Sequence, residues 1–241
     1  MTQICQFSYY EICELLGDEH VPERYDRMLG ALSEQEMELL RTKSVFIAGC
    51  GGLGGYLLEY LTRLGVARIR IADGDVFETS NLNRQLLSEP ERIGTKKVDA
   101  AAARVRRINP DVMIEKVPEN LTAENAEALL KSCDLALDAL DNAEARRVLS
   151  EGCSKAGIPW IHGAIQGWIS QAAISTPGDR LIEALYPSDE AAGKASLPLT
   201  PALCAAMQAS LCTQLLAGRE VEYGRVWCFD LLNMVLESYQ I

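Results

Sequence analysis

The sequence predicts an α/β protein with a Rossmann-like, doubly wound, mainly parallel sheet that antiparallel strands continue in the C-terminal half. Apolar segments of strand length alternate with helical segments over 44–158, and a glycine-rich turn follows the first of them. Two adjacent extended segments, 160–166 and 168–176, are typical of an antiparallel hairpin. We therefore expect one domain over residues 1–241, with a helical segment over 1–43, a Rossmann-like half over 44–158 and a mixed half over 159–241.

The elements of the first half follow from apolar spacing, helix caps and chain breakers. Ser33 is followed three residues later by Glu36, which has the form of a capping box and predicts a short helix to Leu40. The strands are expected at 45–48, 68–72, 112–117 and 135–139, and the helices at 3–16, 53–63, 95–108, 122–130 and 142–156.

The C-terminal half departs from this alternation after the predicted hairpin. Residues 177–198 are polar, rich in Pro, Gly, Ser and Asp, and show no period, so we expect an irregular crossover loop there. Such a length without regular structure inside a compact domain is usually functional or disordered. An apolar helix is expected over 201–216, and one or two closing strands over 226–238.

Composition excludes several classes of function. The chain is 48% apolar and 24% charged, which is typical of a globular protein, and its net charge of −11 argues against non-specific binding to nucleic acid or acidic lipid. No signal peptide is visible and no apolar stretch reaches the roughly 18 residues that span a membrane, so we expect a cytoplasmic protein without membrane partners. The eight cysteines form no Cys-x-x-Cys pair and only two histidines are present, which favours reduced, buried thiols and no zinc site.

The glycine-rich turn is the first functional signal. Gly49, Gly51 and Gly54 fit Gly-x-Gly-x-x-Gly directly after a strand and at the start of a helix, with Gly52 inside the turn. Glycines allow backbone N–H groups to approach a phosphate at the positive end of a helix. Asp73 lies nineteen residues beyond Gly54 at the end of the second strand, where an acid binds ribose hydroxyls. Together these residues predict a nucleotide site.

A polar segment after the second strand indicates how the phosphates are used. It comprises Asp75, Ser80, Asn81, Leu82, Asn83, Arg84 and Gln85, and Lys97 opens the next helix. Arg84 and Lys97 are placed to neutralise charge on a leaving pyrophosphate, a role that nucleotidyl transfer assigns to fixed cations. A nicotinamide enzyme needs no such set, because hydride transfer leaves the pyrophosphate untouched. The alternative for a single Arg or Lys is a solvated surface charge.

Asp141 and Asn142 follow the strand predicted at 135–139. Ligands of doubly wound sheets bind outside the carboxyl ends of the strands, so these residues should face the same crevice as Gly52 and Asp73. A carboxylate beside a triphosphate is unfavourable unless a cation lies between them, which makes Asp141 a candidate for holding Mg²⁺. Asn142 also suits an N-cap, and a pure capping pair without a metal role is the alternative.

The motifs in this order resemble the ThiF/MoeB/HesA adenylyltransferases, bacterial relatives of ubiquitin-activating enzymes, in a variant without zinc. They are Arg24-Tyr25-Asp26-Arg27, Gly49-x-Gly51-Gly52-Leu53-Gly54, Asp73-Gly74-Asp75, Ser80 to Gln85, Gly94-x-x-Lys97-Val98, Ile108-Asn109-Pro110 and Asp141-Asn142-x-x-x-Arg146. The resemblance implies binding of ATP and Mg²⁺. It also implies activation of the C-terminal glycine carboxylate of a small ubiquitin-like sulfur carrier, of the ThiS or MoaD kind, as an acyl-adenylate with release of pyrophosphate.

The resemblance also implies roles for single residues. Gly52 would contact ATP through its backbone, Asp73 would bind ribose, and the segment from Ser80 to Arg84 would line the phosphates. Arg84 and Lys97 would stabilise charge, and Asp141 would position Mg²⁺. Arg27 would reach into the ATP site of a neighbouring subunit, so a homodimer is expected. A separate sulfurtransferase is a further expected partner, as the source of the sulfide that accepts the acyl group.

The chain departs from the family pattern at its cysteines. Leu185-Tyr186-Pro187 is kept, but Leu181 and Ala184 stand where many relatives have a Cys-x-x-Cys pair for zinc. Residues 191–203 contain no cysteine for a thioester or persulfide step, and Cys204 begins an apolar helix. Three alternatives stay open: the same adenylation of a peptide or of a modified tRNA carboxylate, a nicotinamide oxidoreductase, and a noncatalytic scaffold.

Overall fold

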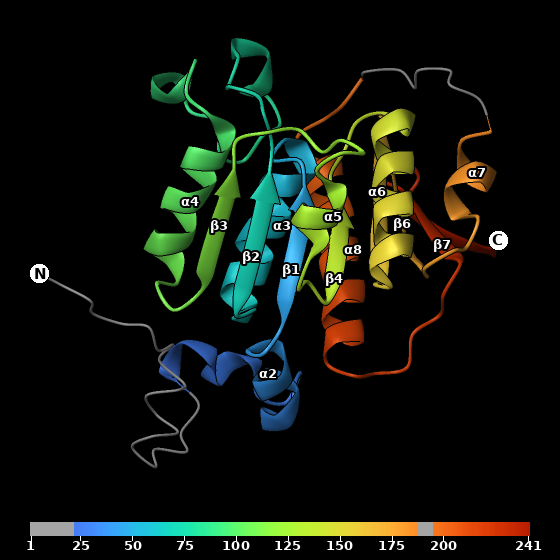
Figure 1. Cartoon of the computed structure of the whole chain (residues 1–241), viewed down its shortest axis with the longest axis horizontal. Coiled ribbons are helices and arrows are strands. Elements are labelled where there is room, and N and C mark those ends of the chain that lie inside the picture. Colours follow the sequence, from blue (N-terminus) through green and yellow to red (C-terminus); the bar gives the residue numbers. More distant parts are fainter. Residues whose placement is uncertain (1–21, 188–194) are drawn as a thin grey trace, which may run out of the picture.

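The computed structural model describes residues 22–187 and 195–241. The helix expected over 3–16 and part of the crossover loop expected over 177–198 lie outside these ranges. One eight-stranded sheet runs through the described chain in the order β3-β2-β1-β4-β5-β6-β7-β8 (Figure 1). The prediction that both halves share one sheet is therefore confirmed.

The sheet is parallel at one end and antiparallel at the other, as predicted. Its strands are β1 (Ser44–Ala48), β2 (Arg68–Ala72), β3 (Met113–Val117), β4 (Leu135–Asp138), β5 (Trp160–Gln166), β6 (Ile169–Ser175), β7 (Arg225–Asp230) and β8 (Val235–Gln240). Strands β3, β2, β1, β4 and β5 pair in parallel, and β5 to β8 pair antiparallel. Ala48 pairs with both Ala72 and Asp138, so β1, β2 and β4 end together at one edge of the sheet. We call this the carboxyl edge.

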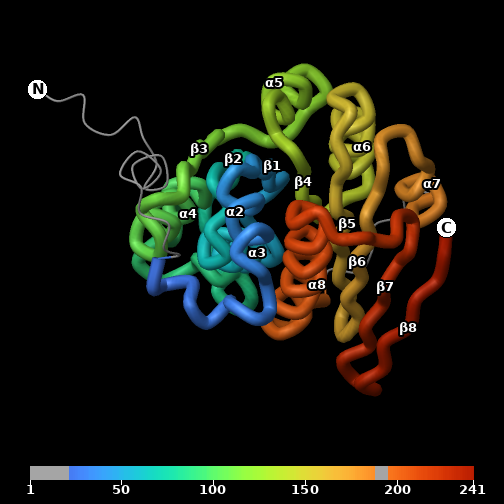
Figure 2. Tube along the Cα trace, turned by 90° about the horizontal axis from the view of Figure 1, so that it is seen from below, coloured from blue at the N-terminus to red at the C-terminus, as the bar shows by residue number. Residues whose placement is uncertain are grey.

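Helices cover both faces of the sheet, α3, α4 and α8 on one face and α5, α6 and α7 on the other (Figure 2). The helices are η1 (Glu23–Met28), α2 (Glu34–Leu40), α3 (Gly52–Leu64), η2 (Thr79–Asn81), η3 (Pro90–Arg92), α4 (Lys97–Ile108), α5 (Ala126–Leu130), α6 (Ala143–Ala156), α7 (Leu181–Leu185) and α8 (Leu199–Leu216). The predicted capping box of α2 is confirmed, because the Ser33 side chain accepts the Glu36 N–H and Glu36 accepts the Ser33 N–H. Each face of the sheet buries its own apolar cluster, around Leu137 and Ile161 on one side and around Phe46 and Trp160 on the other.

Two expectations need correction. The region expected to be irregular contains the helix α7. Its residues Leu181 and Ile182 are buried, and the Asp179 carboxylate accepts the Leu181 N–H at the start of the helix (3.2 Å). The helix expected from residue 122 starts at Ala126. The Asn125 side chain accepts the Thr122 N–H (2.8 Å), and this hydrogen bond stabilises a turn before the helix. The segment around Arg27, which was expected to be helical, is a 3₁₀ helix.

Helix α8 corrects the expectation about apolar stretches. Its 18 residues have a mean hydropathy of 1.2, so by length and composition it is the one helix in the described residues that could cross a membrane. It packs in the core instead: Cys204 and Cys212 are buried, and the Gln208 side chain donates to the Asp138 and Ile161 carbonyls (2.8 and 3.2 Å). We interpret α8 as a core helix.

Candidate functional site

The glycine turn lies at the centre of the carboxyl edge, between β1 and α3. Gly49 has a φ of +100°, and a β-carbon there would lie 2.7 Å from the Ala139 carbonyl oxygen. A β-carbon on Gly54 would lie 2.1 Å from the Gly49 carbonyl oxygen. These two glycines are therefore required for packing. Gly51 differs, because its nearest neighbour would be the Gln85 Nε2 at 3.7 Å, which leaves the backbone of the turn approachable.

The loop after β4 lies directly against the glycine turn. Ala139 donates its N–H to the Ala48 carbonyl (3.0 Å), and two residues later the chain presents Asp141. Asn142 caps α6 by accepting the Ala145 N–H (2.9 Å), so its predicted capping role is confirmed. The Asp141 carboxylate is exposed, accepts the Asn142 side-chain amide (3.1 Å), and forms no ion pair within 22–187 and 195–241. An exposed carboxylate oxygen is the kind of ligand that Mg²⁺ takes, so the residue fits the metal.

The end of β2 brings two acids and a lysine together. Asp73 accepts the Cys50 N–H (2.7 Å) and the Asp75 N–H (2.8 Å), which fixes the glycine turn to β2. The Lys97 ammonium lies 2.9 Å from the Asp75 carboxylate and 3.9 Å from that of Asp73. Only 6% of Lys97 is exposed. The Lys97 ammonium is therefore paired with two carboxylates beside the glycine turn.

The polar segment over 78–85 forms a compact turn through local hydrogen bonds. Asn81 is buried and accepts the Glu78 N–H (3.0 Å), so it shapes the turn. The Arg84 guanidinium donates to the Ser80 carbonyl and to the Asn83 side chain (both 3.0 Å). Each of these contacts is local, and the Arg84 charge has no acidic partner in the described chain.

Gln85 is the residue of this segment that faces the glycine turn. It is 7% exposed, its Nε2 lies beside Gly51, and its Oε1 is buried without a hydrogen-bond partner among the described residues. A buried polar atom without a partner costs free energy. The Gln85 side chain lies beside the glycine turn, where a phosphate is predicted to bind, so a polar ligand there could be its partner. Leu82, by contrast, is exposed on the outside of the turn.

Arg27 is a predicted site residue that does not lie at the carboxyl edge of its own chain. Its segment is anchored by Tyr25, whose hydroxyl accepts the Asn109 side-chain amide (2.7 Å) where the chain runs from α4 toward β3. Leu40, after the same segment, accepts the Ala67 N–H just before β2 begins. Both contacts lie at the amino-terminal edge of the sheet, because Asn109 precedes β3 and Ala67 precedes β2; helix α2 lies below the strands in Figure 1. Arg27 is exposed there, at the end of the molecule opposite Asp141.

A buried polar cluster beneath the Asp141 loop was missed as a unit. Asp138 and His162 are fully buried, and the Asp138 Oδ2 accepts from the His162 Nδ1 (2.8 Å) and the Arg146 Nε (2.9 Å). Burial raises the pKa of Asp138. The Arg146 charge and the His162 hydrogen bond lower the pKa by a larger amount, so it lies below its ordinary value. One signal could have revealed the cluster: an acid and a histidine each interrupt an otherwise apolar strand.

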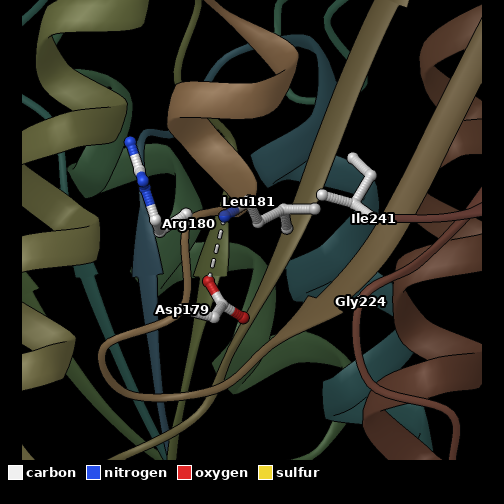
Figure 3. A pocket seen from close by; sticks show the side chains of 5 residues that line it. All are labelled: Asp179, Arg180, Leu181, Gly224 and Ile241. Atoms are coloured by element: carbon white, nitrogen blue, oxygen red, sulfur yellow. Dashed lines mark hydrogen bonds between the residues drawn. The ribbon is translucent and has the colours of Figure 1, made fainter.

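A separate pocket lies between the start of α7 and the C-terminal strands (Figure 3). Asp179, Arg180, Leu181, Gly224 and Ile241 line it. It adjoins the end of β6, where Ser175 pairs with Trp160 at the start of β5, so it lies at the edge opposite the glycine turn. It contains none of the predicted site residues.

The fold and its carboxyl edge define a Rossmann-like α/β protein in which Asp73, Lys97 and the loop after β4 lie beside the glycine turn. The chain belongs to the ThiF family, whose sequence model matches residues 25–241. It is 31% identical over 245 residues to the SAMP-activating enzyme E1 of Haloferax volcanii, covering 98% of this chain and 85% of that protein. It is 37% identical over 154 residues to the sulfur carrier protein adenylyltransferase of Thermus thermophilus, covering 63% of this chain and 57% of that protein.

Solved structures share this fold. PaaA superposes with a TM-score of 0.79 at 20% identity, covering 100% of this chain and 86% of the other. Escherichia coli MccB with ATP superposes with a TM-score of 0.79 at 17% identity, covering 98% and 79%. The predicted fold class and family resemblance are confirmed.

Proposed function

We propose that this chain is an ATP-dependent adenylyltransferase that activates the C-terminal glycine carboxylate of a small ubiquitin-like sulfur carrier as an acyl-adenylate. The observation that carries the proposal is the convergence of the glycine turn, Lys97 and Asp141 at one edge of the sheet. The chain also matches the family along nearly its whole length, and two of its relatives are named SAMP-activating enzyme E1 and sulfur carrier protein adenylyltransferase. We infer that residues 1–241 act as one adenylation domain.

The chemistry needs no nucleophile from the protein. A carboxylate oxygen of the carrier attacks the α-phosphorus of ATP, an acyl O–P bond forms, and the bond to the β-phosphate oxygen breaks as pyrophosphate leaves. The backbone at Gly51 and Gly52 binds phosphate oxygens, Asp73 binds the ribose, and Arg84 and Lys97 neutralise the charge that develops on pyrophosphate. Mg²⁺ held at Asp141 would neutralise phosphate charge before and during the transfer.

Pyrophosphate exchange tests this proposal directly. Labelled pyrophosphate should enter ATP only when a purified carrier ending in Gly-Gly is present, and a carrier lacking its last glycine should be inert. Arg84→Ala and Asp141→Ala should abolish exchange while leaving the melting temperature unchanged, since both side chains make local contacts only. Exchange with none of a panel of such carriers would exclude the carrier proposal and favour a peptide or tRNA carboxylate.

Binding distinguishes an adenylyltransferase from an oxidoreductase. ATP with Mg²⁺ at a hundred times its dissociation constant stabilises a protein by about 2.7 kcal/mol. We expect that shift with ATP and none with NAD. Stabilisation by NAD alone would reverse the assignment, and stabilisation by neither would favour a scaffold.

We infer a homodimer in which Arg27 of one subunit completes the site of the other. The support is geometric: Arg27 lies at the opposite edge from Asp141, so one chain cannot bring both to one nucleotide. Arg27→Ala and Asp141→Ala should each be inactive. Mixed and allowed to exchange subunits, they should recover about a quarter of the wild-type exchange rate, because half the dimers are mixed and each has one intact site of two. No recovery on mixing would exclude a shared site.

A cytoplasmic location and a separate sulfurtransferase complete the proposal. The six described cysteines are free thiols, five of them buried, as is usual in a reducing compartment. The adenylate formed at this site would be consumed by a sulfur nucleophile. Transfer of sulfur to the adenylated carrier by a purified sulfurtransferase, with none in its absence, would test that partner.

A further inference from the structure

The polar cluster beneath the Asp141 loop has no role in the adenylation chemistry described above. It consists of Asp138 at the end of β4, Arg146 on α6 and His162 on β5. All three are at least nine-tenths buried. Burying charged groups costs free energy unless they are paired and hydrogen-bonded. The cluster therefore needs an explanation beyond packing, and its contacts supply one.

The cluster clamps the residue that precedes Asp141. The Asp138 Oδ1 accepts the Leu140 N–H (2.9 Å), and the Arg146 Nη2 donates to the Leu140 carbonyl (2.6 Å). Because the same Arg146 also binds the Asp138 Oδ2, the N–H and the carbonyl of Leu140 are held by one pair of charges. The backbone that presents Asp141 is thus fixed from beneath.

His162 holds this pair in place from the next strand. Its Nδ1 donates to the Asp138 Oδ2 (2.8 Å), because its Nε2 accepts the Gln171 side-chain amide (3.0 Å). The Gln171 Oε1 in turn faces the Cys228 thiol (4.0 Å), which fits this orientation of the amide. Burial lowers the pKa of His162, so the imidazole is neutral and the cluster carries no net charge.

Tyr186, directly after α7, covers the outside of the cluster. Its ring lies 5.0 Å from the Arg146 guanidinium carbon and packs edge-on against the His162 ring at 5.7 Å. Its hydroxyl is 3.4 Å from the His162 Nε2. Arg147 also donates to the Tyr186 carbonyl (3.1 Å). A continuous set of polar contacts therefore joins the end of α7 to the loop that bears Asp141.

We propose that His162, with Asp138 and Arg146, is a positioning residue that sets the orientation of Asp141 toward Mg²⁺ and nucleotide. The inference rests on the proposed function, because the binding of Mg²⁺ by Asp141 is part of that proposal. A group that orients a metal ligand without touching the metal typically changes metal affinity by about 10–100-fold when removed. Within the described residues no hydrogen bond, ion pair or ring contact joins His162 to the glycine turn, so its loss should change the metal requirement more than it changes the binding of nucleotide.

Two substitutions at one position separate orientation from packing. In His162→Asn the side-chain amide keeps a donor near the place of Nδ1, whereas His162→Leu fills the site without a donor. We expect His162→Leu to raise, by about tenfold, the Mg²⁺ concentration at half-maximal ATP-induced thermal stabilisation. Its affinity for ATP in EDTA should stay at the wild-type value. His162→Asn should restore a requirement within about threefold of wild type.

A measurement on the wild-type protein keeps the inference testable if His162→Leu does not fold. The chain has only two histidines, His20 and His162, so the imidazole nitrogen signals of ¹⁵N-histidine protein are assigned by comparison with His162→Asn. The His162 signals should shift when Mg²⁺ is added to the ATP-bound protein. They should not shift with ATP in EDTA.

The outcomes are distinct. An unchanged Mg²⁺ dependence in a folded His162→Leu protein would overturn the inference and leave the proposed function standing. The same holds if the His162 nitrogen signals do not shift with Mg²⁺ although thermal stabilisation shows that Mg²⁺ and ATP bind. Equal losses in the Asn and Leu variants would also overturn it, since packing alone would then explain the effect. Wild-type protein that binds no ATP at all would refute the proposed function, and the inference with it.

Discussion

Replacing Gly54 by alanine should destabilise the protein through one backbone contact. A carbon–oxygen contact is normally no shorter than about 3.3 Å, and the new methyl carbon would lie 2.1 Å from the Gly49 carbonyl oxygen and 2.9 Å from its carbon. The overlap is roughly 1.2 Å, and the opposing atom belongs to the backbone, so β1 and α3 must move apart. Overpacking of this kind costs about 1–3 kcal/mol, and we expect the upper end.

The matched control is Gly51→Ala, three residues earlier in the same turn. Its methyl group would meet nothing closer than 3.7 Å, so the fold should be unaffected. That methyl would, however, occupy the space in which a phosphate approaches the backbone. We expect a normal melting temperature and loss of the stabilisation by ATP with Mg²⁺.

Differential scanning fluorimetry with and without ATP and Mg²⁺ measures both effects. For a domain of this size 1 kcal/mol corresponds to about 2–4 °C, so Gly54→Ala should melt roughly 6–12 °C lower. A Gly54→Ala protein as stable as wild type would refute the packing requirement. A Gly51→Ala protein that keeps the full ATP shift would show that the turn is not the phosphate seat.

Three further predictions concern the cap, the buried histidine and the buried thiol. Ser33→Ala should cost about 1 kcal/mol in the free energy of unfolding, measured by urea denaturation, because it removes the acceptor for the Glu36 N–H; no loss would contradict the capping role. Burial lowers the pKa of His162 below 6.5, so the unfolded chain binds a proton there that the folded chain does not. The free energy of unfolding should thus fall as the pH drops below about 6.5, and His162→Asn, titrated in parallel, should lose this component. Burial raises the pKa of the Cys204 thiol to about 12, so it stays protonated at neutral pH; Cys204→Ser should keep pyrophosphate exchange within about twofold of wild type, and a large loss would indicate a covalent role.

Local signals were sufficient for most of the fold. Strand β1 is a short apolar run, β2 alternates arginine with isoleucine, and the hairpin of β5 and β6 turns at Gly167, so pattern and breakers placed them within one or two residues. The glycine turn is equally local, since its function depends on spacing within six residues. Helix α7 was missed because its two buried residues lie inside a polar stretch, and only the tertiary contact makes them a helix.

The candidate site was predictable in its members and not in their pairings. Lys97 and Asp75 are 22 residues apart, and their 2.9 Å contact depends on how α4 returns to the end of β2. Asp138 and His162 are 24 residues apart and meet because β4 and β5 are neighbours in the sheet. Pairwise geometry of this kind follows from strand order, which residue spacing alone does not encode.

The place of α8 in the chain has a consequence for biosynthesis. This helix covers the sheet over Leu137 and Ile161, yet it is synthesised after β1 to β6. Synthesis proceeds at about 5–20 residues per second and domains begin to fold from the N-terminus. For several seconds the nascent chain therefore presents an apolar sheet face without its covering helix, followed by an 18-residue segment apolar enough to enter a membrane. Chaperone demand during translation should be concentrated in that interval.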